Sequence, residues 1–175
     1  MLRRLRYQVA TSLDGFIADE KGGYDWIVMD PDIDFGALVA QFDTLLMGRG
    51  TYEITAGGGP GFPGMATYVV STTLDPKKHR KVTVVSKDVE AFVADLKRKP
   101  GKDIWLFGGG VLFRSMLEAG LVDRVELAII PVLLGAGIPV LPGLEGVAKL
   151  KLDEVKRYPK SGTMLLGYEV VRAKR

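Results

Sequence analysis

The stretch "DIWLFGGGVLFRSMLEAG", residues 103–120, contains a strand signal, a glycine turn and a helix signal in immediate succession. Residues 104–107 form an apolar run typical of a buried strand, and residues 111–119 carry apolar side chains at helical spacing. Three consecutive glycines separate them, although glycine loses more backbone entropy on folding than any other residue. The stretch therefore predicts a strand, a turn and a helix. The three glycines of the turn indicate that side chains would not fit there.

Two physical requirements explain such glycines. At the carboxyl end of a parallel strand, bare backbone N–H groups at the positive end of a helix dipole bind an anion such as a diphosphate. Close packing of a helix against its strand also requires glycine, so this stretch alone leaves both explanations open. Its spacing does not match G-x-G-x-x-G and it comes late in the chain, which disfavours an ordinary Rossmann dinucleotide domain.

Outward from this unit, short apolar runs alternate with amphipathic or turn-rich connections. Predicted strands cover residues 5–10, 44–47, 66–70, 82–85, 104–107 and 125–130. Most of these runs do not alternate, so we expect strands covered on both faces in a largely parallel sheet. Asp88 is the predicted N-cap of a helix that ends at "KPG", residues 99–101. Extended segments on either side of residues 160–162 predict an antiparallel hairpin.

The predicted fold class is α/β. The pattern indicates a three-layer α/β/α sandwich, with a mixed, mostly parallel sheet that ends in the C-terminal hairpin. The 175 residues, 47% of them hydrophobic, suit a single domain over residues 1–175. "TAGGGPGFPG", residues 55–64, is expected to be a surface loop rather than a linker between domains.

Composition excludes several classes of protein. No apolar stretch approaches the roughly 18 residues of a membrane span, and the N-terminus lacks the features of a secretory signal, so we expect a cytoplasmic protein. The chain has no cysteine and a single histidine, His79, which disfavours disulfides, zinc sites and Ser-His-Asp catalysis. We therefore predict no metal. A net charge of +3 with scattered basic residues argues against a nucleic-acid partner.

Two further strand ends carry groups that suit a phosphate. In "LLMGRGTYE", residues 45–53, Gly48 turns the chain, and Arg49 and Thr51 supply hydrogen-bond donors. A solvated arginine and a simple helix cap are the structural alternatives. Ser71 and Thr72 follow the next predicted strand, where they donate to a phosphate or end the strand as a turn. Ligands of open α/β sheets bind outside the carboxyl ends of the strands, so the coincidence favours a ligand site.

The first predicted strand is followed by "SLDG", residues 12–15. Here Asp14 is expected to hydrogen-bond locally and Gly15 to take a positive φ, as in a tight turn. The alternative is that this loop covers a bound ligand.

In this order, the four stretches resemble the dihydrofolate reductase-like superfamily, and more closely its branch with the reductase domain of riboflavin biosynthesis. The matching segments span nearly the whole chain: "SLDGFIA", "LLMGRGTYE", "YVVST", "IWLFGGGVLFRSML" and "GLVDRVELAIIPVLLGAG". The last segment, residues 120–137, looks like the riboflavin branch rather than dihydrofolate reductase proper. In the biosynthetic reductase the motif loop usually has a lysine where this chain has Phe16.

The resemblance implies an NADPH-dependent reductase, similar to 5-amino-6-(5-phosphoribosylamino)uracil reductase, that transfers hydride to a small heterocyclic substrate. It implies Asp14 as the catalytic-site aspartate beside the substrate and Ala10 as a backbone contact of the nicotinamide. The other cofactor-binding residues that it implies are Gly48, Arg49 and Thr51 at the phosphates, Ser71 and Thr72 at the adenosine ribose and its 2'-phosphate, and Gly108, Gly109, Gly110, Val111 and Leu112 at the diphosphate.

Two alternatives stay open. A pterin reductase would need a carboxylate for the pterin ring, and Asp32 and Asp34 are the candidates, although each also suits a helix N-cap. A nucleotide-binding protein without turnover would keep the cofactor site alone. Cofactor chemistry needs mainly orientation and electrostatics from the protein, which fits the absence of an obvious nucleophile or acid–base pair in the sequence.

Residues 125–144 form the most apolar stretch, and residues 131–144 carry no charge. Val132, Leu133 and Leu134 lie beyond the part that a strand would bury. Because an exposed apolar patch usually marks an interface, and pairing about a two-fold axis buries the same patch twice, we expect a homodimer. The alternative is that the C-terminal hairpin covers the segment. The family that the chain resembles also commonly forms dimers.

Overall fold

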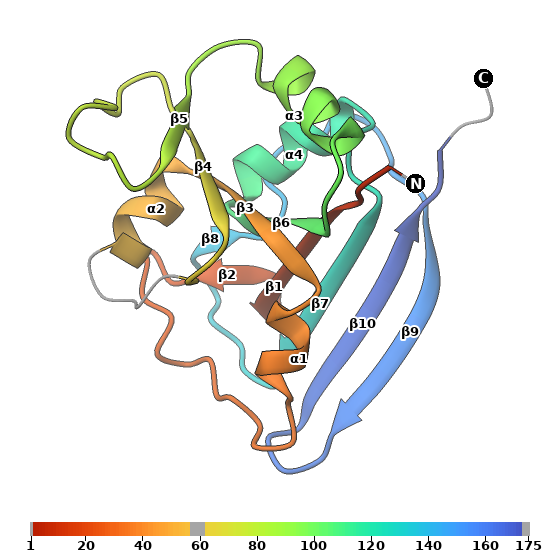
Figure 1. Cartoon of the computed structure of the whole chain (residues 1–175). Coiled ribbons are helices and arrows are strands. Elements are labelled where there is room, and N and C mark those ends of the chain that lie inside the picture. Colours follow the sequence, from red (N-terminus) through yellow and green to blue (C-terminus); the bar gives the residue numbers. More distant parts are fainter. Residues whose placement is uncertain (1, 57–61, 173–175) are drawn as a thin grey trace.

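The computed structural model describes residues 2–56 and 62–172. Within these ranges an eight-stranded sheet has the order β5-β4-β3-β6-β1-β7-β10-β9, and a small second sheet pairs β2 with β8 (Figure 1). The elements are β1 (Leu5–Ser12), β2 (Phe16–Ala18), α1 (Phe35–Val39), β3 (Phe42–Gly48), α2 (Arg49–Ala56), β4 (Ala66–Val70), β5 (Thr83–Val85), α3 (Val89–Arg98), β6 (Asp103–Gly108), α4 (Gly110–Glu118), β7 (Arg124–Ile130), β8 (Ile138–Pro139), β9 (Leu150–Tyr158) and β10 (Thr163–Val170).

Strand directions confirm the predicted mixed sheet. All pairings from β5 to β7 are parallel, whereas β10 pairs antiparallel with both β7 and β9. The predicted hairpin is present, and Gly162 in its turn has a φ of +77°, a conformation that side chains disfavour. Because the six parallel strands share a direction, their carboxyl ends lie along one edge. This edge is called the carboxyl edge below.

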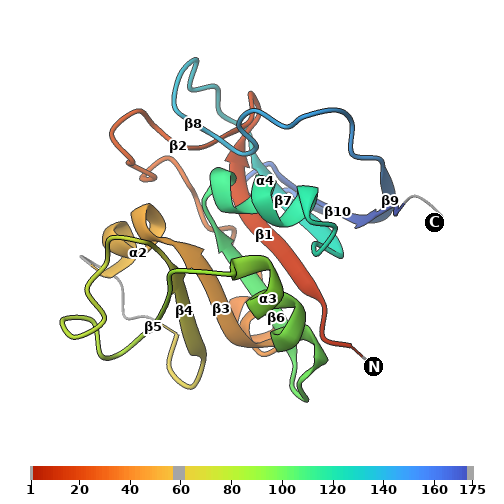
Figure 2. The same ribbon diagram turned by 90° about the horizontal axis from the view of Figure 1, so that it is seen from above.

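Helices cover both faces of the sheet, which confirms the three-layer sandwich. α3 and α4 pack on one face, where Val93 and Met116 join Tyr7 and Leu106 in one core (Figure 2). α1 and α2 lie on the other face, where a second core is built around Leu45, Met47 and Trp105. The tyrosine of the first core, Tyr7, stacks on Phe113 of α4 with ring centres 3.8 Å apart.

One face of β1 and β7 carries buried charged side chains rather than apolar ones. Arg6, Arg124 and Glu126 are all buried, with exposed fractions of 8%, 7% and 4%. Arg6 donates two hydrogen bonds to Glu126, at 2.8 and 2.6 Å. Burial of charge is tolerated here because the opposite charges neutralise each other. The alternating residues of "LRYQVATS" are thus apolar on one face only.

The predicted helix caps at Asp34 and Asp88 have different outcomes. Asp34 is the N-cap of α1, and its carboxylate accepts a hydrogen bond from the Ala37 backbone N–H at 2.8 Å. Asp88 stands at the N-cap of α3, but it makes no side-chain cap bond and its φ is +49°. A left-handed backbone turns the carboxylate away from the N–H groups that it would cap. Of the predicted loop at 55–64, residues 57–61 lie outside the described residues.

The segment after β7 is anchored more firmly than the sequence indicates. β8 pairs with β2, and the backbone N–H of Val140 donates to Gly15 O at 2.9 Å. Val140 and Leu141 pack against the first core, while Leu133 is 71% exposed. The C-terminal hairpin does not cover this segment, because β10 extends the sheet beside β7. Val140 and Leu141 therefore do not contribute to an exposed apolar patch, whereas Leu133 and Ile138 remain exposed.

Among the helices of the described residues, none has both the length and the apolar character needed to cross a bilayer.

Candidate active site

The carboxyl edge brings together the strand ends that the sequence singled out. In the register of the sheet, Gly48 lies opposite Val70, and Met47 lies opposite Gly108. Ala10, near the end of β1, is half-buried and lies opposite Ala128 of β7. The stretches that contain Gly48, Ser71 and Gly108 are therefore neighbours along one line, as expected for a ligand that crosses several strands.

Thr51 of α2 lies against the glycine turn after β6. A Cβ atom placed on Gly108 would be 3.3 Å from Thr51 Oγ1, and one on Gly109 would be 3.5 Å from it. Gly108 has a φ of +149°, which excludes other residues on conformational grounds. The hydroxyl of Thr51 and the backbone of Gly109 thus face the same small space between α2 and α4.

Two glycines at this edge have no structural need to be glycine. Gly48 has no other described atom within 4 Å of an added Cβ, and Gly109 has an ordinary φ of −92° with only Thr51 Oγ1 in contact range. Side chains there would project into space that the protein itself leaves open. Backbone N–H groups that flank such space at a helix start fit a phosphate, so the residues present suit a dinucleotide cofactor.

Gly110 has a different role from Gly48 and Gly109, because other parts of the protein pack closely against it. A Cβ atom on Gly110 would lie 2.6 Å from Pro139 O and 2.9 Å from Val140 O. The carbonyl of Val140 also accepts a hydrogen bond from the Tyr7 hydroxyl at 3.3 Å. Residues 139–140 therefore pack against the start of α4. This packing is sufficient to require glycine at position 110.

The remaining residues predicted at the diphosphate lie in the first turn of α4. Val111 is 63% exposed, whereas the side chain of Leu112 is buried in the first core. The Phe113 N–H donates to Gly109 O at 3.1 Å, and the preceding N–H groups of a helix have no partner within it. Leu112 and Gly110 can therefore contact a ligand only through their backbone.

Arg49 links the ends of β3 and β4. Its Nη1 donates to Thr73 Oγ1 at 2.8 Å, and its Nε lies 3.7 Å from Glu53. The Ser71 hydroxyl accepts hydrogen bonds from the N–H groups of Thr73 and Leu74, at 3.1 and 3.0 Å. Ser71 thus shapes the turn, while Arg49 and Thr72 are exposed beside it. An exposed guanidinium held by one neutral hydroxyl and one distant carboxylate has donors to spare.

Asp14 fastens two loops together. Its carboxylate accepts hydrogen bonds from the Ser12 hydroxyl at 2.6 Å and from the Gly135 N–H at 2.7 Å. The N–H of Leu134 also points to both oxygens, at 3.2 and 3.1 Å. The Ser12 hydrogen bond, followed by that of Gly135, lowers the pKa of the Asp14 carboxyl below its ordinary value. Asp14 is therefore ionised at neutral pH, and Gly15 has the predicted positive φ, +88°.

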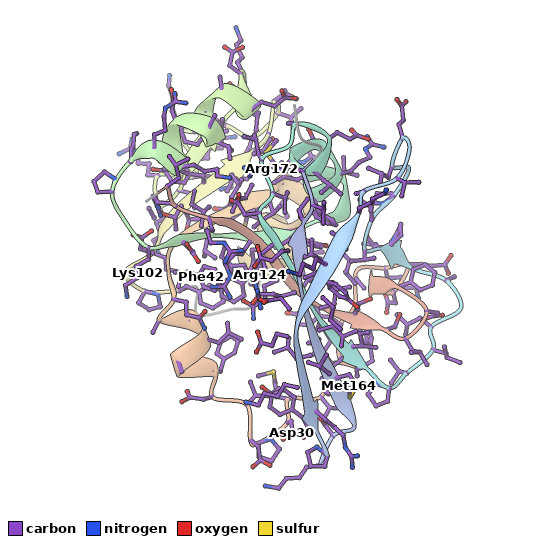
Figure 3. All side chains as sticks on the ribbon, turned by 90° about the vertical axis from the view of Figure 1, so that its right-hand side faces the viewer. Asp30, Phe42, Lys102, Arg124, Met164 and Arg172 are labelled. Carbon is purple, nitrogen blue, oxygen red and sulfur yellow. The ribbon has the colours of Figure 1, made fainter. Side chains whose placement is uncertain are left out.

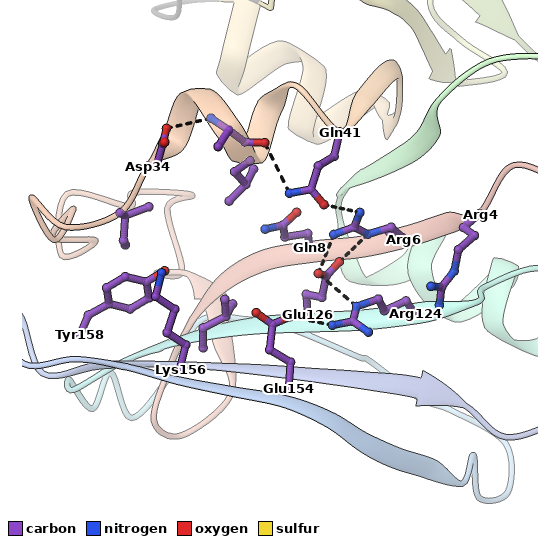
Figure 4. A pocket seen from close by; sticks show the side chains of 14 residues that line it. Arg4, Arg6, Gln8, Asp34, Gln41, Arg124, Glu126, Glu154, Lys156 and Tyr158 are labelled. Atoms are coloured by element: carbon purple, nitrogen blue, oxygen red, sulfur yellow. Dashed lines mark hydrogen bonds and ion pairs between the residues drawn. The ribbon is translucent and has the colours of Figure 1, made fainter.

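A cavity of about 370 Å³ lies on the face of the sheet that carries α1 (Figure 4). The sequence reasoning did not find it. It is lined by Arg4, Arg6, Gln8, Ile33, Asp34, Ala37, Leu38, Gln41, Arg124, Glu126, Glu154, Lys156, Tyr158 and Leu165. One sequence signal could have indicated this cavity. Polar residues occur at every second position at the start of β1, and this spacing places Arg6, Gln8 and Ala10 on one face of the sheet.

Arg124 is the centre of an ion-pair network beside this cavity, and Figure 4 shows it next to Glu126 and Glu154. Its guanidinium contacts Glu126 at 3.2 Å, Glu154 at 2.7 Å and Glu169 at 3.0 Å, and it also pairs with Asp153. Burial works against the charge, but the hydrogen bonds and charges of these carboxylates raise the pKa of Arg124 above its ordinary value. The arginine therefore stays charged, and its ion pairs connect β7 to β9 and β10.

Asp32 and Asp34, the two candidate carboxylates for a pterin ring, both form hydrogen bonds within the protein. Asp34 caps α1, as described above, and Asp32 accepts a hydrogen bond from Lys160 Nζ at 2.7 Å. The cap interpretation is thus confirmed for Asp34 and wrong for Asp32. Nearby, the buried Asp30 accepts from the Ser161 N–H at 2.7 Å, which ties the segment before α1 to the hairpin turn (Figure 3).

Comparison with known proteins places this architecture in a family. Residues 3–166 match the RibD C-terminal domain, so the chain belongs to that family. Two uncharacterized Bacillus subtilis proteins, YyaP and YwjB, are each 33% identical to it over 95% and 90% of its length, and over 94% of their own.

Solved structures agree with the family and the fold. A putative riboflavin biosynthesis protein from Shewanella sp. PV-4 has a TM-score of 0.83 at 29% identity, covering 98% of this chain and all of that one. The deaminase/5-amino-6-(5-phosphoribosylamino)uracil reductase of Thermotoga maritima has a TM-score of 0.71 at 17% identity, covering 97% of this chain and 57% of that one. Dihydrofolate reductase from Enterococcus faecalis, complexed with NADP(H), has a TM-score of 0.69 at 18% identity, covering 98% of this chain and all of that one. The last two likenesses show a shared dihydrofolate reductase-like fold.

Proposed function

We propose that this protein is an NADPH-dependent oxidoreductase of the riboflavin-pathway type, resembling 5-amino-6-(5-phosphoribosylamino)uracil reductase. The observation that carries the proposal lies at the carboxyl edge. Neither the backbone conformation nor the packing requires glycine at positions 48 and 109, and the absence of side chains there leaves open space. Thr51 and Arg49 lie beside that space. Family membership and the names of the Shewanella and Thermotoga proteins support the reductase type, and the NADP(H) complex of the E. faecalis enzyme supports the cofactor.

The bound nicotinamide would supply the hydride, and the chain would supply binding and orientation. The N–H groups at the start of α4, together with Gly48 and Thr51, would hold the diphosphate. Arg49 and Thr72 would hold the 2'-phosphate, with Ser71 shaping their turn. The backbone of Ala10 would contact the nicotinamide, which lies one strand away from the glycine turn.

Asp14 would act as a positioning residue beside the substrate. Its ionised carboxylate holds the N–H groups of Leu134 and Gly135, so the loop after β7 stays next to the loop after β1. Both loops border the carboxyl edge near Ala10. A protonated carboxyl would lose acceptor capacity for these N–H groups, so the lowered pKa of Asp14 suits this holding role rather than proton donation at neutral pH.

Titration of the protein with NADPH and with NADH, followed by calorimetry, tests the cofactor. We expect NADPH to bind more tightly; failure to bind either would reject the proposal. NADPH oxidation is then measured with 5-amino-6-(5-phosphoribosylamino)uracil and with dihydropterin. Turnover of the pterin alone would favour the pterin reductase, and tight cofactor binding without any turnover would favour a nucleotide-binding protein.

We further propose a homodimer, formed through the end of the sheet rather than through residues 131–144. Leu127 and Val155 both lie opposite Leu166 in the register, so their side chains share one face. On β9, Leu150, Leu152 and Val155 are 43%, 51% and 55% exposed, and such an apolar surface favours pairing. Sedimentation should give a species of twice the monomer mass that Val155→Asp dissociates and Leu133→Asp does not.

A further inference from the structure

The loop between β4 and β5 carries a strong positive charge. This cationic loop, residues 74–82, reads "LDPKKHRKV" and contains four of the 24 basic residues and one of the 21 acidic residues. Its excess of three positive charges equals the formal net charge of the whole chain, +3, so the rest of the sequence is balanced in charge. A local excess of this size produces a positive potential at the surface around the loop.

The four basic side chains of the cationic loop are exposed and unpaired. All of them lie at the surface: Lys77, Lys78, Arg80 and Lys81. Within residues 2–56 and 62–172, none of them forms an ion pair with a carboxylate. Arg6 and Arg124, by contrast, are buried against carboxylates. The charges of the loop are therefore available to an anion from solution.

The cationic loop is fixed in position despite its exposure. Leu74 and Val82, near its two ends, pack against the second core. The carboxylate of Asp75 accepts a hydrogen bond from the Lys77 N–H at 2.9 Å, which shapes the turn. In the middle of the loop, His79 Nδ1 lies at hydrogen-bond distance, 3.0 Å, from the hydroxyl of Tyr52 on α2. The cations therefore keep their place beside α2 (Figure 1).

The cationic loop lies next to the proposed 2'-phosphate site. Thr73, which accepts the hydrogen bond of Arg49, directly precedes the loop in the sequence. Tyr52, which contacts His79, lies about one helical turn from Arg49 on α2. Figure 2 shows the same connection beside α2 from above. Contacts at its start and at its middle thus place the loop at the side of the Arg49 site.

Exposed cations act on a ligand mainly through their summed field. A single contact of an exposed lysine contributes little to affinity, because water and salt screen it and because ordering the long side chain costs entropy. The field of several cations reaches further, about 10 Å at 0.1 M salt, and it raises the rate at which an anionic molecule arrives. The loop is therefore suited to speed an encounter rather than to hold a complex.

We infer that the cationic loop steers an anionic dinucleotide toward the Arg49 site. The inference rests on the proposed function and adds to it a kinetic role for residues outside the binding contacts. NADPH carries a 2'-phosphate in addition to its diphosphate, and a phosphate monoester has a charge of about −1.5 to −2 at pH 7. Steering therefore favours NADPH over NADH in the association rate.

The test measures association and dissociation rates of NADPH by stopped-flow fluorescence. The triple variant with Lys77→Gln, Lys78→Gln and Lys81→Gln removes three charges and keeps Arg80, whose Nε donates to the Lys77 carbonyl at 3.4 Å. At about 0.05 M salt we expect its association rate constant to fall about fivefold, while dissociation changes by less than about twofold. At about 0.5 M salt the loss should shrink below about twofold, because the Debye length is shorter. The loss should be smaller for NADH.

A matched variant separates the place of the charges from their number. Three exposed lysines lie near the starts of β6 and β9, at the opposite edge of the sheet: Lys99, Lys149 and Lys151. Replacing all three by glutamine removes the same charge, and the association rate constant should stay within about twofold of the wild-type value. Thermal melting should be unchanged in both triple variants, since all six side chains are exposed.

Two results would overturn the inference. Equal losses of association rate in the two triple variants would mean that only the net charge acts. Faster dissociation from the loop variant with unchanged association would mean that the lysines hold the cofactor by direct contact.

The equilibrium titration described above distinguishes the inference from the proposed function. Absence of NADPH binding by the unaltered protein would reject both together. NADPH binding with an association rate that neither salt nor the loop variant changes would reject the steering role alone.

Discussion

The carboxyl edge of the sheet is built from glycines and backbone, whereas the amino-terminal halves of β1 and β7 are filled by charged side chains. At the edge, Gly48 and Gly109 leave open space beside Thr51. At the other end, Arg6 and Arg124 are buried among carboxylates. The same sheet thus separates a ligand-binding end from an end that is held together by ion pairs. Where side chains are absent a ligand can approach the backbone, and where they are paired the strands are locked together.

The largest expected effect is at the charged end. Arg124→Ala leaves Glu126, Glu154 and Glu169 facing one another without their shared cation, so we expect a loss of about 3–5 kcal/mol of unfolding free energy. Urea denaturation measures it. The matched control is Arg98→Ala, which removes an exposed pair with Asp95 and should cost less than about 1 kcal/mol. Similar losses in the two variants would show that the buried network contributes no more to the unfolding free energy than an exposed ion pair.

The next prediction separates two adjacent glycines. Gly110→Val forces a side chain against Pro139 O and Val140 O and should destabilise the fold by about 3 kcal/mol. Gly109→Ala meets only Thr51 Oγ1 at an ordinary distance, so its stability should change by less than about 1 kcal/mol. Its NADPH affinity should nevertheless fall at least about tenfold, because a methyl group enters the space proposed for the diphosphate. Normal NADPH binding by Gly109→Ala would mean that this space is not the cofactor site.

A smaller effect is expected from Arg49→Ala, which tests the 2'-phosphate. A charge-assisted hydrogen bond contributes about 1.5–3 kcal/mol, so NADPH should lose about that much binding free energy. NADH lacks the 2'-phosphate and should lose much less. Calorimetry with both cofactors gives the comparison, and equal losses would remove Arg49 from the 2'-phosphate site. Melting should hardly change, since Arg49 is exposed.

The smallest effect concerns Asp14 and pH. Hydrogen bonds from Ser12 and Gly135 hold its pKa in the folded state below the ordinary 3.8. A carboxyl with a depressed pKa stabilises the fold above its unfolded pKa and loses that contribution as the pH falls through its folded pKa. The melting-temperature difference between wild type and Asp14→Asn should therefore be constant at neutral pH and shrink below about pH 4. A difference that grows on acidification would contradict the assigned direction.

Local signals in the sequence predicted most elements. The apolar runs gave the strands of the main sheet, and "SLDG" and "KSG" gave turns whose glycines have positive φ. The cap at Asp34 was also predicted, because a cap depends on residues three positions away. The predicted side-chain cap at Asp88 was wrong, because the backbone conformation of Asp88 follows from how α3 joins the sheet. No local sequence signal indicates that conformation.

The candidate site divides in the same way. Its glycines, Arg49 and Thr51 could be found from the sequence, since each stands at the end of an apolar run. The sequence could not tell Gly109 from Gly110, because the difference comes from Pro139 and Val140, about thirty residues further on. Nor could it show that Gln8 Oε1 is buried without a hydrogen-bond partner among the described residues, since burial depends on the tertiary structure.

The sequence by itself determined the alternation of strands and helices, the glycine turn and the membership of a recognisable family, because these depend on neighbours within a few positions. Only the tertiary structure decided which glycine serves packing, which arginines are neutralised, and which buried polar atoms are left without a partner in the described part of the chain. The physical reason is that charge pairing, steric contact and enclosure arise between groups far apart in the chain. Arg6 meets Glu126, and Asp14 meets Gly135, only when the sheet has formed.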